Sequence, residues 1–100
     1  MIINNITCKV RWAILEAWLS WQLDEHIPAT LATGQFDEYR LYRLLDVEED
    51  EGPTFIIQFF TTSRERYERF SRDYAEGLQK EGWSKWGDGF IAFRTLMESV

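Results

Sequence analysis

Apolar and polar residues alternate with a period of two along several stretches of the chain, a pattern typical of strands with one buried face. In Ile2–Val10 the even-numbered residues are mostly apolar and the odd-numbered residues are mixed. Both alternating sets of Thr54–Thr61 are largely apolar, which predicts a central strand covered on both faces. The pattern also predicts strands at residues 36–47 and 90–96.

Between the first two predicted strands, apolar residues recur with the period of a helix. Residues 11–27 form this helix, and its broad, mostly apolar side consists of Trp12, Leu15, Trp18, Leu19, Gln22, Leu23 and His26. Pro28 has no amide proton and crowds the turn before it, so we expect the regular helix to break or kink just before it. One more turn is expected at residues 29–33, with Gly34 as a left-handed stop.

A second helix is predicted after the central strand. Thr62 and Glu65 have the spacing of a capping box, which marks the first turn of a helix. Gly82 is expected to end this helix, so Trp83 and Trp86 are expected in a connecting loop. The buried side of the helix is expected to consist of Tyr67, Phe70, Tyr74 and Leu78.

The order of these elements predicts one α+β domain over residues 1–100. It is the order of a ferredoxin-like β-α-β-β-α-β plait, with a four-stranded antiparallel sheet and both helices on one face. The uncovered face is expected to carry Ile3, Asn5, Thr7, Ile56, Gln58, Phe60, Ala92 and Arg94. Because this surface is too apolar to face water, we expect a homodimer packed sheet against sheet, with a cleft that keeps the polar groups.

Composition and charge narrow the classes of partner. The formal net charge of -6 repels phosphate backbones and argues against nucleic acid. The single cysteine, Cys8, cannot form an intrachain disulfide, and no stretch approaches the ~18 apolar residues of a membrane span. We therefore expect a soluble cytoplasmic protein with no membrane partner. One His and one Cys argue against a dedicated metal site, and we expect no cofactor.

Four polar residues are candidates for a site. His26 is either a general base, because its ordinary pKa lies near working pH, or a structural residue that closes a hydrogen bond beneath Pro28. Asn5, Gln58 and Arg94 either orient a small carbonyl or carboxylate ligand in the cleft, or satisfy one another across the dimer interface. The structural interpretation is favoured in both cases, since no nucleophile or acid partner is fixed by spacing.

Several segments resemble a small bacterial family known as domain of unknown function 4286. They are Met1-Ile2-Ile3, Asn5-Ile6-Thr7, Trp18-Leu19-Ser20-Trp21, Glu25-His26-Ile27-Pro28, Ala32-Thr33-Gly34 with Phe36, Gln58-Phe59-Phe60 and Ala92-Phe93-Arg94-Thr95-Leu96. Asn4 and Phe55 stand where the resemblance leads us to expect Tyr, which puts tyrosine-based chemistry there in doubt. The resemblance implies a ferredoxin-like domain of the dimeric α/β-barrel type, in which two open sheets close on each other.

That superfamily also contains cofactor-free monooxygenases, haem-degrading enzymes and small-molecule isomerases, so two functions remain open. The first, which we rank higher, is a non-catalytic dimeric module that binds a small apolar or aromatic ligand, or a protein, in the cleft between the sheets. The second is a cofactor-independent enzyme, monooxygenase- or isomerase-like, with His26 as the proton-transfer group and Asn5, Gln58 or Arg94 as polarising groups. The position of His26 relative to a cavity lined by those three residues discriminates between them.

Overall fold

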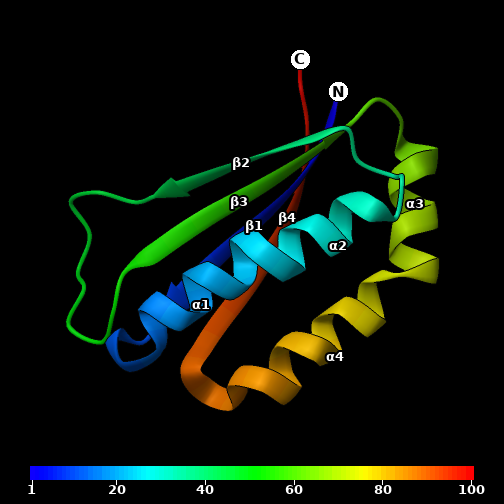
Figure 1. Cartoon of the computed structure of the whole chain (residues 1–100). Helices are drawn as coiled ribbons and strands as arrows, with labels where there is room; N and C mark the ends of the chain where they lie inside the picture. The colour runs from blue at the N-terminus through cyan, green and yellow to red at the C-terminus, as the bar shows by residue number, and fades with distance from the viewer.

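A computed structural model describes residues 1–100, and its strands and helices alternate in the predicted order (Figure 1). The elements are β1 (Ile2–Val10), a 3₁₀ turn η1 (Trp12–Ile14), α1 (Leu15–Trp21), a π-helical turn η2 (Gln22–His26), α2 (Ile27–Ala32), β2 (Glu38–Arg43), β3 (Thr54–Thr61), α3 (Arg64–Asp73), α4 (Ala75–Trp86), a 3₁₀ turn η3 (Gly87–Gly89) and β4 (Phe90–Glu98). None of the helices is both long enough and apolar enough to cross a membrane.

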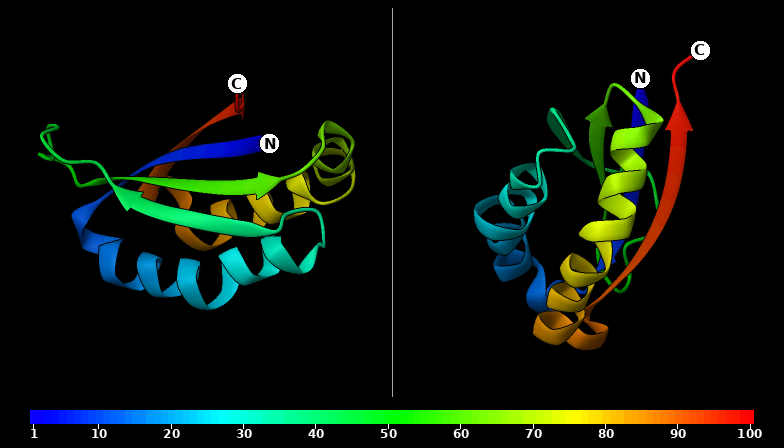
Figure 2. Two further views of the ribbon diagram at one scale, coloured as in Figure 1. Left: turned by 90° about the horizontal axis from the view of Figure 1, so that it is seen from above. Right: turned by 90° about the vertical axis from the view of Figure 1, so that its right-hand side faces the viewer.

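The four strands form one sheet in the order β2-β3-β1-β4, and every neighbouring pair is antiparallel. All four helices lie on one side of this sheet, as both views of Figure 2 show. The two chain ends lie side by side at one end of the sheet, where the Ser99 amide donates to the Met1 carbonyl. This arrangement confirms the predicted ferredoxin-like α+β plait.

The core lies between the sheet and the helices, and β1 and β3 meet it with the predicted alternation. Phe55, Ile57 and Phe59 of β3 are buried, whereas Ile56, Gln58 and Phe60 on the opposite face are partly exposed. The buried apolar residues that pack together are Cys8, Val10, Trp18, Trp21, Ile27, Phe36, Phe55, Ile57, Phe59 and Phe70. Within the single chain, helices therefore cover only one of the two apolar faces of β3.

The strand β4 faces the other way from the prediction. Residues directly opposite each other in neighbouring strands share a face of the sheet. Arg94 lies opposite Ile6, and Ala92 lies opposite Cys8, so both belong to the face that the helices cover. The open face instead receives Ile91 and Phe93, which are 58% and 64% exposed. The prediction that Ala92 and Arg94 lie on the open face is wrong.

The regular α-helix is interrupted just before Pro28, as predicted. The interruption is the π-helical turn η2, and a helical path continues from Leu15 to Ala32. The Ile27 amide donates to the Gln22 carbonyl, five residues earlier. This wider turn comes just before Pro28, where an α-helix would need the N–H that Pro28 lacks and would push its ring against the preceding turn. Gly34 has a φ of +80°, as a left-handed stop requires.

The second helix differs from the prediction at three points. Its cap is Ser63, whose hydroxyl accepts from the Arg66 amide, and not Thr62. Tyr74 has a non-helical φ of -129°, which divides the helix into α3 and α4 and leaves the Tyr74 side chain exposed instead of buried. Gly82 does not end the helix but lies buried within α4, which continues to Trp86. Trp83 and Trp86 are therefore helical residues.

Candidate functional site

A small cavity lies between the covered face of the sheet and the helical layer. Its volume is about 40 Å³. Its apolar wall is formed mainly by sheet residues, namely Ile6, Cys8, Ile57, Phe59, Phe90 and Ala92. The polar side chains that reach it are Gln22, His26, Thr30, Gln79 and Arg94, and Trp83 stands beside them. An apolar wall with a few convergent polar groups is the usual composition of a small-molecule site.

Three of these polar residues come from the helical path that contains η2. Gln22, His26 and Thr30 are spaced by four residues, so they follow one another along one side of the helix. Gln22 and Thr30 are buried, and the Thr30 hydroxyl donates to the His26 carbonyl at 3.0 Å. Sequence reasoning missed Gln22 and Thr30. The signal was present, because polar residues at this spacing interrupt an otherwise apolar side.

His26 is held on three sides. Its Nε2 lies 3.3 Å from the Leu78 carbonyl, which only accepts, so Nε2 donates there. Its Nδ1 lies 3.2 Å from the side-chain oxygen Oε1 of Gln22. The ring stacks on Trp21 with the ring centres 4.5 Å apart. A neutral His26 ring is fully satisfied when the Gln22 amide turns its NH₂ group toward Nδ1.

The environment of His26 favours that neutral ring. Burial lowers its pKa from the ordinary 6.5, and the positive charge of Arg94 acts in the same direction. The hydrogen bond to Leu78 and the negative charge of Glu81 oppose the shift without cancelling it. His26 is therefore uncharged at neutral pH, and both of its nitrogens already have protein partners.

Cys8 is the other reactive group at the cavity. Burial raises the pKa of its thiol from 9.0 to about 12, and the nearby Arg94 only partly offsets this effect. Because the thiolate is the nucleophilic form, a thiol with this pKa is inert at neutral pH. No group of three His, Cys, Asp or Glu side chains gathers closely enough to hold a metal ion.

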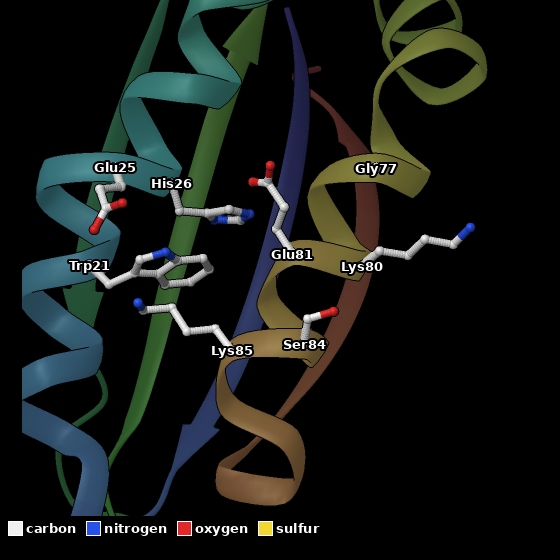
Figure 3. A pocket seen from close by; sticks show the side chains of 8 residues that line it. All are labelled: Trp21, Glu25, His26, Gly77, Lys80, Glu81, Ser84 and Lys85. Atoms are coloured by element: carbon white, nitrogen blue, oxygen red, sulfur yellow. The ribbon is translucent and has the colours of Figure 1, made fainter.

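An open groove between the η2 region and α4 approaches the cavity from outside. In Figure 3, Trp21 and His26 project from the first helix toward α4, and Glu81 projects from α4 toward the His26 ring. The groove has a volume of about 600 Å³, but Trp21 is the one apolar residue among the eight that line it. His26 lines both the groove and the cavity. It therefore stands at the boundary between them.

The predicted site residues do not converge on one place. Asn5 and Gln58 are opposite each other on the open face, where the Gln58 amide donates to the Asn5 side-chain oxygen at 3.1 Å. Arg94 lies on the covered face, on the same side of the sheet as His26, and both line the cavity. The prediction of one cleft that joins Asn5, Gln58 and Arg94 is wrong, because it rested on the inverted parity of β4.

Comparisons with known proteins identify the fold. A family model described as "Domain of unknown function (DUF4286)" matches residues 1–100. No functionally curated protein matches the sequence. A solved structure described as a dimeric ferredoxin-like protein from an uncultured marine organism has a TM-score of 0.74 and 8% identity, over 99% of this chain and 94% of that one.

Two further solved structures have similar scores. An ethyl tert-butyl ether d (ethd) family protein from Bacillus halodurans has a TM-score of 0.69 and 12% identity, with 100% of both chains covered. A putative antibiotic biosynthesis monooxygenase from Nitrosomonas europaea has a TM-score of 0.69 and 10% identity, with 100% of this chain and 99% of that one covered. At these identities the likeness establishes the fold alone.

Proposed function

This chain belongs to the family described as "Domain of unknown function (DUF4286)", and from the geometry of its site we propose that it is a non-catalytic module for binding a small ligand. The ligand has an apolar or aromatic body, and it binds at the cavity between the sheet and the helices, with most of its body at the cavity rim. The proposal treats residues 1–100 as one domain. The observation that carries it is the apolar cavity wall with Gln22, His26 and Arg94 directed at it.

The state of the reactive groups supports binding rather than catalysis. Neither nitrogen of His26 is free to take a proton from a ligand, because each already faces a protein partner. The Cys8 thiol stays protonated at neutral pH. Buried polar groups that are satisfied within the protein orient a ligand by shape and hydrogen bonding without reacting with it.

The open face of the sheet supports a homodimer as the working form. Its apolar side chains include Ile91, Phe93 and Tyr42, which are all exposed in the single chain, and the Asn5–Gln58 pair is already satisfied at its centre. Monomers rarely expose apolar patches of this kind. A solved structure with this fold is described as dimeric, and we propose the same state here. Cys8, which is buried and unpaired, is compatible with a reducing cytoplasm.

Native mass spectrometry of freshly purified protein tests the dimer and the ligand together. We expect a dimer in which each chain carries one small molecule. Phe93→Glu should convert the dimer to a monomer, whereas Trp83→Glu should not, because Trp83 is similarly exposed but lies on the helical side. A wild-type monomer at micromolar concentration would refute the dimer while leaving the cavity proposal intact.

A titration with toluene, followed by ¹H–¹⁵N NMR, tests the cavity directly. The indole N–H signal of Trp83 should shift with saturation, because Trp83 lines the cavity. Ala92→Leu fills the cavity and should abolish the shift. The matched control is Ala17→Leu, which adds the same atoms on the exposed side of α1. An unchanged Trp83 signal in the wild type, or an equal shift in Ala92→Leu, would contradict ligand binding in this cavity.

A second function, a cofactor-independent enzyme with His26 as the base, is favoured by one observation. His26 lines both the groove and the cavity, and its lowered pKa keeps it in the basic, neutral form at pH 7. Such an enzyme must open one of the two His26 hydrogen bonds during each turnover. Incubating the copurified molecule with the wild type and with His26→Gln tests this alternative. A molecule that stays chemically unchanged after a day with the wild type would exclude it.

A further inference from the structure

Arg94 differs from every other basic side chain of the protein. Eight of the eleven Lys and Arg side chains form salt bridges with carboxylates. Of the other three, Arg11 donates to the Asp88 carbonyl and Lys85 lies over the Trp86 ring. Arg94 has no carboxylate, carbonyl or aromatic partner in the chain, and it is exposed to solvent although it lines the cavity. Its guanidinium is therefore hydrated, and its donors are open to an anion that displaces this water.

Arg94 lies at the cavity, where its unpaired charge can attract an anionic ligand. The cavity wall contains no Asp or Glu, and Arg94 is the one charged side chain that lines it while His26 is neutral. Its positive charge is felt by both His26 and Cys8. The outer groove is lined by two acidic residues, Glu25 and Glu81, and two basic residues, Lys80 and Lys85, so its charges balance. An anion is therefore favoured inside the cavity, where Arg94 has no opposing carboxylate, over the groove.

Two features define the rest of the ligand. The cavity volume of about 40 Å³ holds only a few water molecules, so most of a ligand must lie at the rim. Trp83 forms part of that rim and is 61% exposed, which leaves its ring available for stacking. Guanidinium groups match carboxylates in planar geometry, and one guanidinium balances one carboxylate charge. A phosphate would carry more charge than this site can balance.

We propose that the ligand is a small monocarboxylate with an aromatic or other apolar body, whose carboxylate pairs with Arg94 and whose body packs against Trp83 and the cavity wall. The proposal rests on the proposed binding function and names the ligand class for the same site. Arg94 acts as the specificity-determining residue, because it separates an acid from a neutral molecule of the same shape.

Two probes of nearly identical shape test this proposal, phenylacetate and 2-phenylacetamide. Isothermal titration calorimetry at pH 7.5 and 50 mM salt should show phenylacetate binding at least about tenfold more tightly to the wild type, the factor that one charge-assisted pair supplies. Arg94→Gln should remove this preference and leave the affinity for the amide within about twofold. The preference should also shrink at 0.5 M salt, because screening weakens a partly exposed ion pair.

The control variant is Arg64→Gln on α3, which removes an exposed arginine outside the cavity and should leave both affinities unchanged. Equal binding of acid and amide to the wild type, or a preference retained in Arg94→Gln, would overturn the proposal. If Arg94→Gln fails to fold, Arg94→Lys and the salt dependence provide the test, since a lysine keeps the charge but loses the planar fork. Binding of toluene without any preference for the acid would overturn only the ligand class, whereas no binding of any probe would overturn the binding function itself.

Discussion

The two faces of the sheet are built from the same strands, but their polar side chains differ in whether they have hydrogen-bond partners within the protein. On the open face, Asn5 and Gln58 satisfy each other across the strands. On the covered face, Arg94 has no protein partner and is exposed to solvent beside the cavity. A polar pair that is bonded within the protein can be buried in an interface, whereas a solvated guanidinium at an apolar wall is available to a ligand. The covered face is therefore the better candidate for ligand binding, and the open face for association.

Two neighbouring phenylalanines of β3 differ most clearly in burial between the two faces. Phe59 is 1% exposed within the core, so Phe59→Ala should lower the free energy of unfolding by ~3–5 kcal/mol through lost burial and a remaining cavity. Phe60 lies on the open face and is partly exposed, so Phe60→Ala should change it by less than ~1 kcal/mol in the monomer. Urea unfolding at a concentration that keeps the protein monomeric measures both. Equal effects would remove the distinction between the two faces.

The pH dependence of the free energy of unfolding shows how well the covered face shields the Cys8 thiol from water. Its native pKa of about 12 exceeds the reference value of 9.0, so the native state keeps a proton that the unfolded chain releases. The contribution of the protonated Cys8 thiol to native-state stability is complete below pH 9.0, and it is lost as the pH rises toward 12. Between pH 8 and pH 10 the wild type should lose about 1 kcal/mol more stability than Cys8→Ala. Parallel pH profiles for the two proteins would show that water reaches the thiol.

Thr61 tests whether a polar group on the covered face destabilises the fold when it has no partner. Its side chain is fully buried, and the hydroxyl has no hydrogen-bond partner. Thr61→Val keeps the shape and should raise the free energy of unfolding by about 1 kcal/mol. The control is Thr95→Val on the exposed side of β4, which should change stability by less than about 0.5 kcal/mol. Destabilisation by Thr61→Val would mean that the hydroxyl has a partner in solution.

Replacing His26 should change the pH dependence of the free energy of unfolding, and this change should be the smallest of these effects. It should also respond most to a bound ligand. Burial lowers the native pKa of His26 below 6.5, so the unfolded chain binds the proton more readily than the native state. The contribution of the neutral His26 ring to native-state stability is present above pH 6.5, and it is lost as the pH falls through the native pKa of His26. Urea unfolding at pH 7.5 and pH 5.5 should therefore show that the free energy of unfolding falls more for the wild type than for His26→Gln. A bound carboxylate should reduce that fall, since it offsets the charge of Arg94.

The sequence predicted the fold because most elements have a clear period. β1 and β3 alternate cleanly, and their bounds and buried sides were predicted correctly. The parity of β4 was not predictable, because apolar residues occur on both of its sides: Phe90, Ala92 and Leu96 on one and Ile91, Phe93 and Met97 on the other. Only the pairing of β4 with β1 decides which set faces the helices.

The errors in the helices have two origins, which are tertiary packing that overrides a local signal and a local signal that is ambiguous. Gly82 has the residue type of a helix end, yet the Phe90 ring packs 3.4 Å from where a Cβ would stand, and α4 continues. Both Thr62 and Ser63 are good capping residues, and the sequence does not distinguish between them. His26 and Arg94 were candidate site residues from the sequence, and the structure places both at the cavity. Their common cavity was not predicted, because it depends on the parity of β4 and on the π-helical turn.

The π-helical turn has a consequence for the ancestry and the engineering of this chain. A π turn contains one residue more than the α turn that it replaces, so η2 is equivalent to a single-residue insertion in an otherwise ordinary helix. Deleting one residue there, such as Asp24, would return the turn to the α form and leave the later residues, Thr30 among them, close to their present directions. His26 would then follow Gln22 by three positions instead of four, and the Pro28 ring would meet the carbonyl of the preceding turn. A one-codon deletion therefore tests whether the wider turn is what admits Pro28 into a continuous helix.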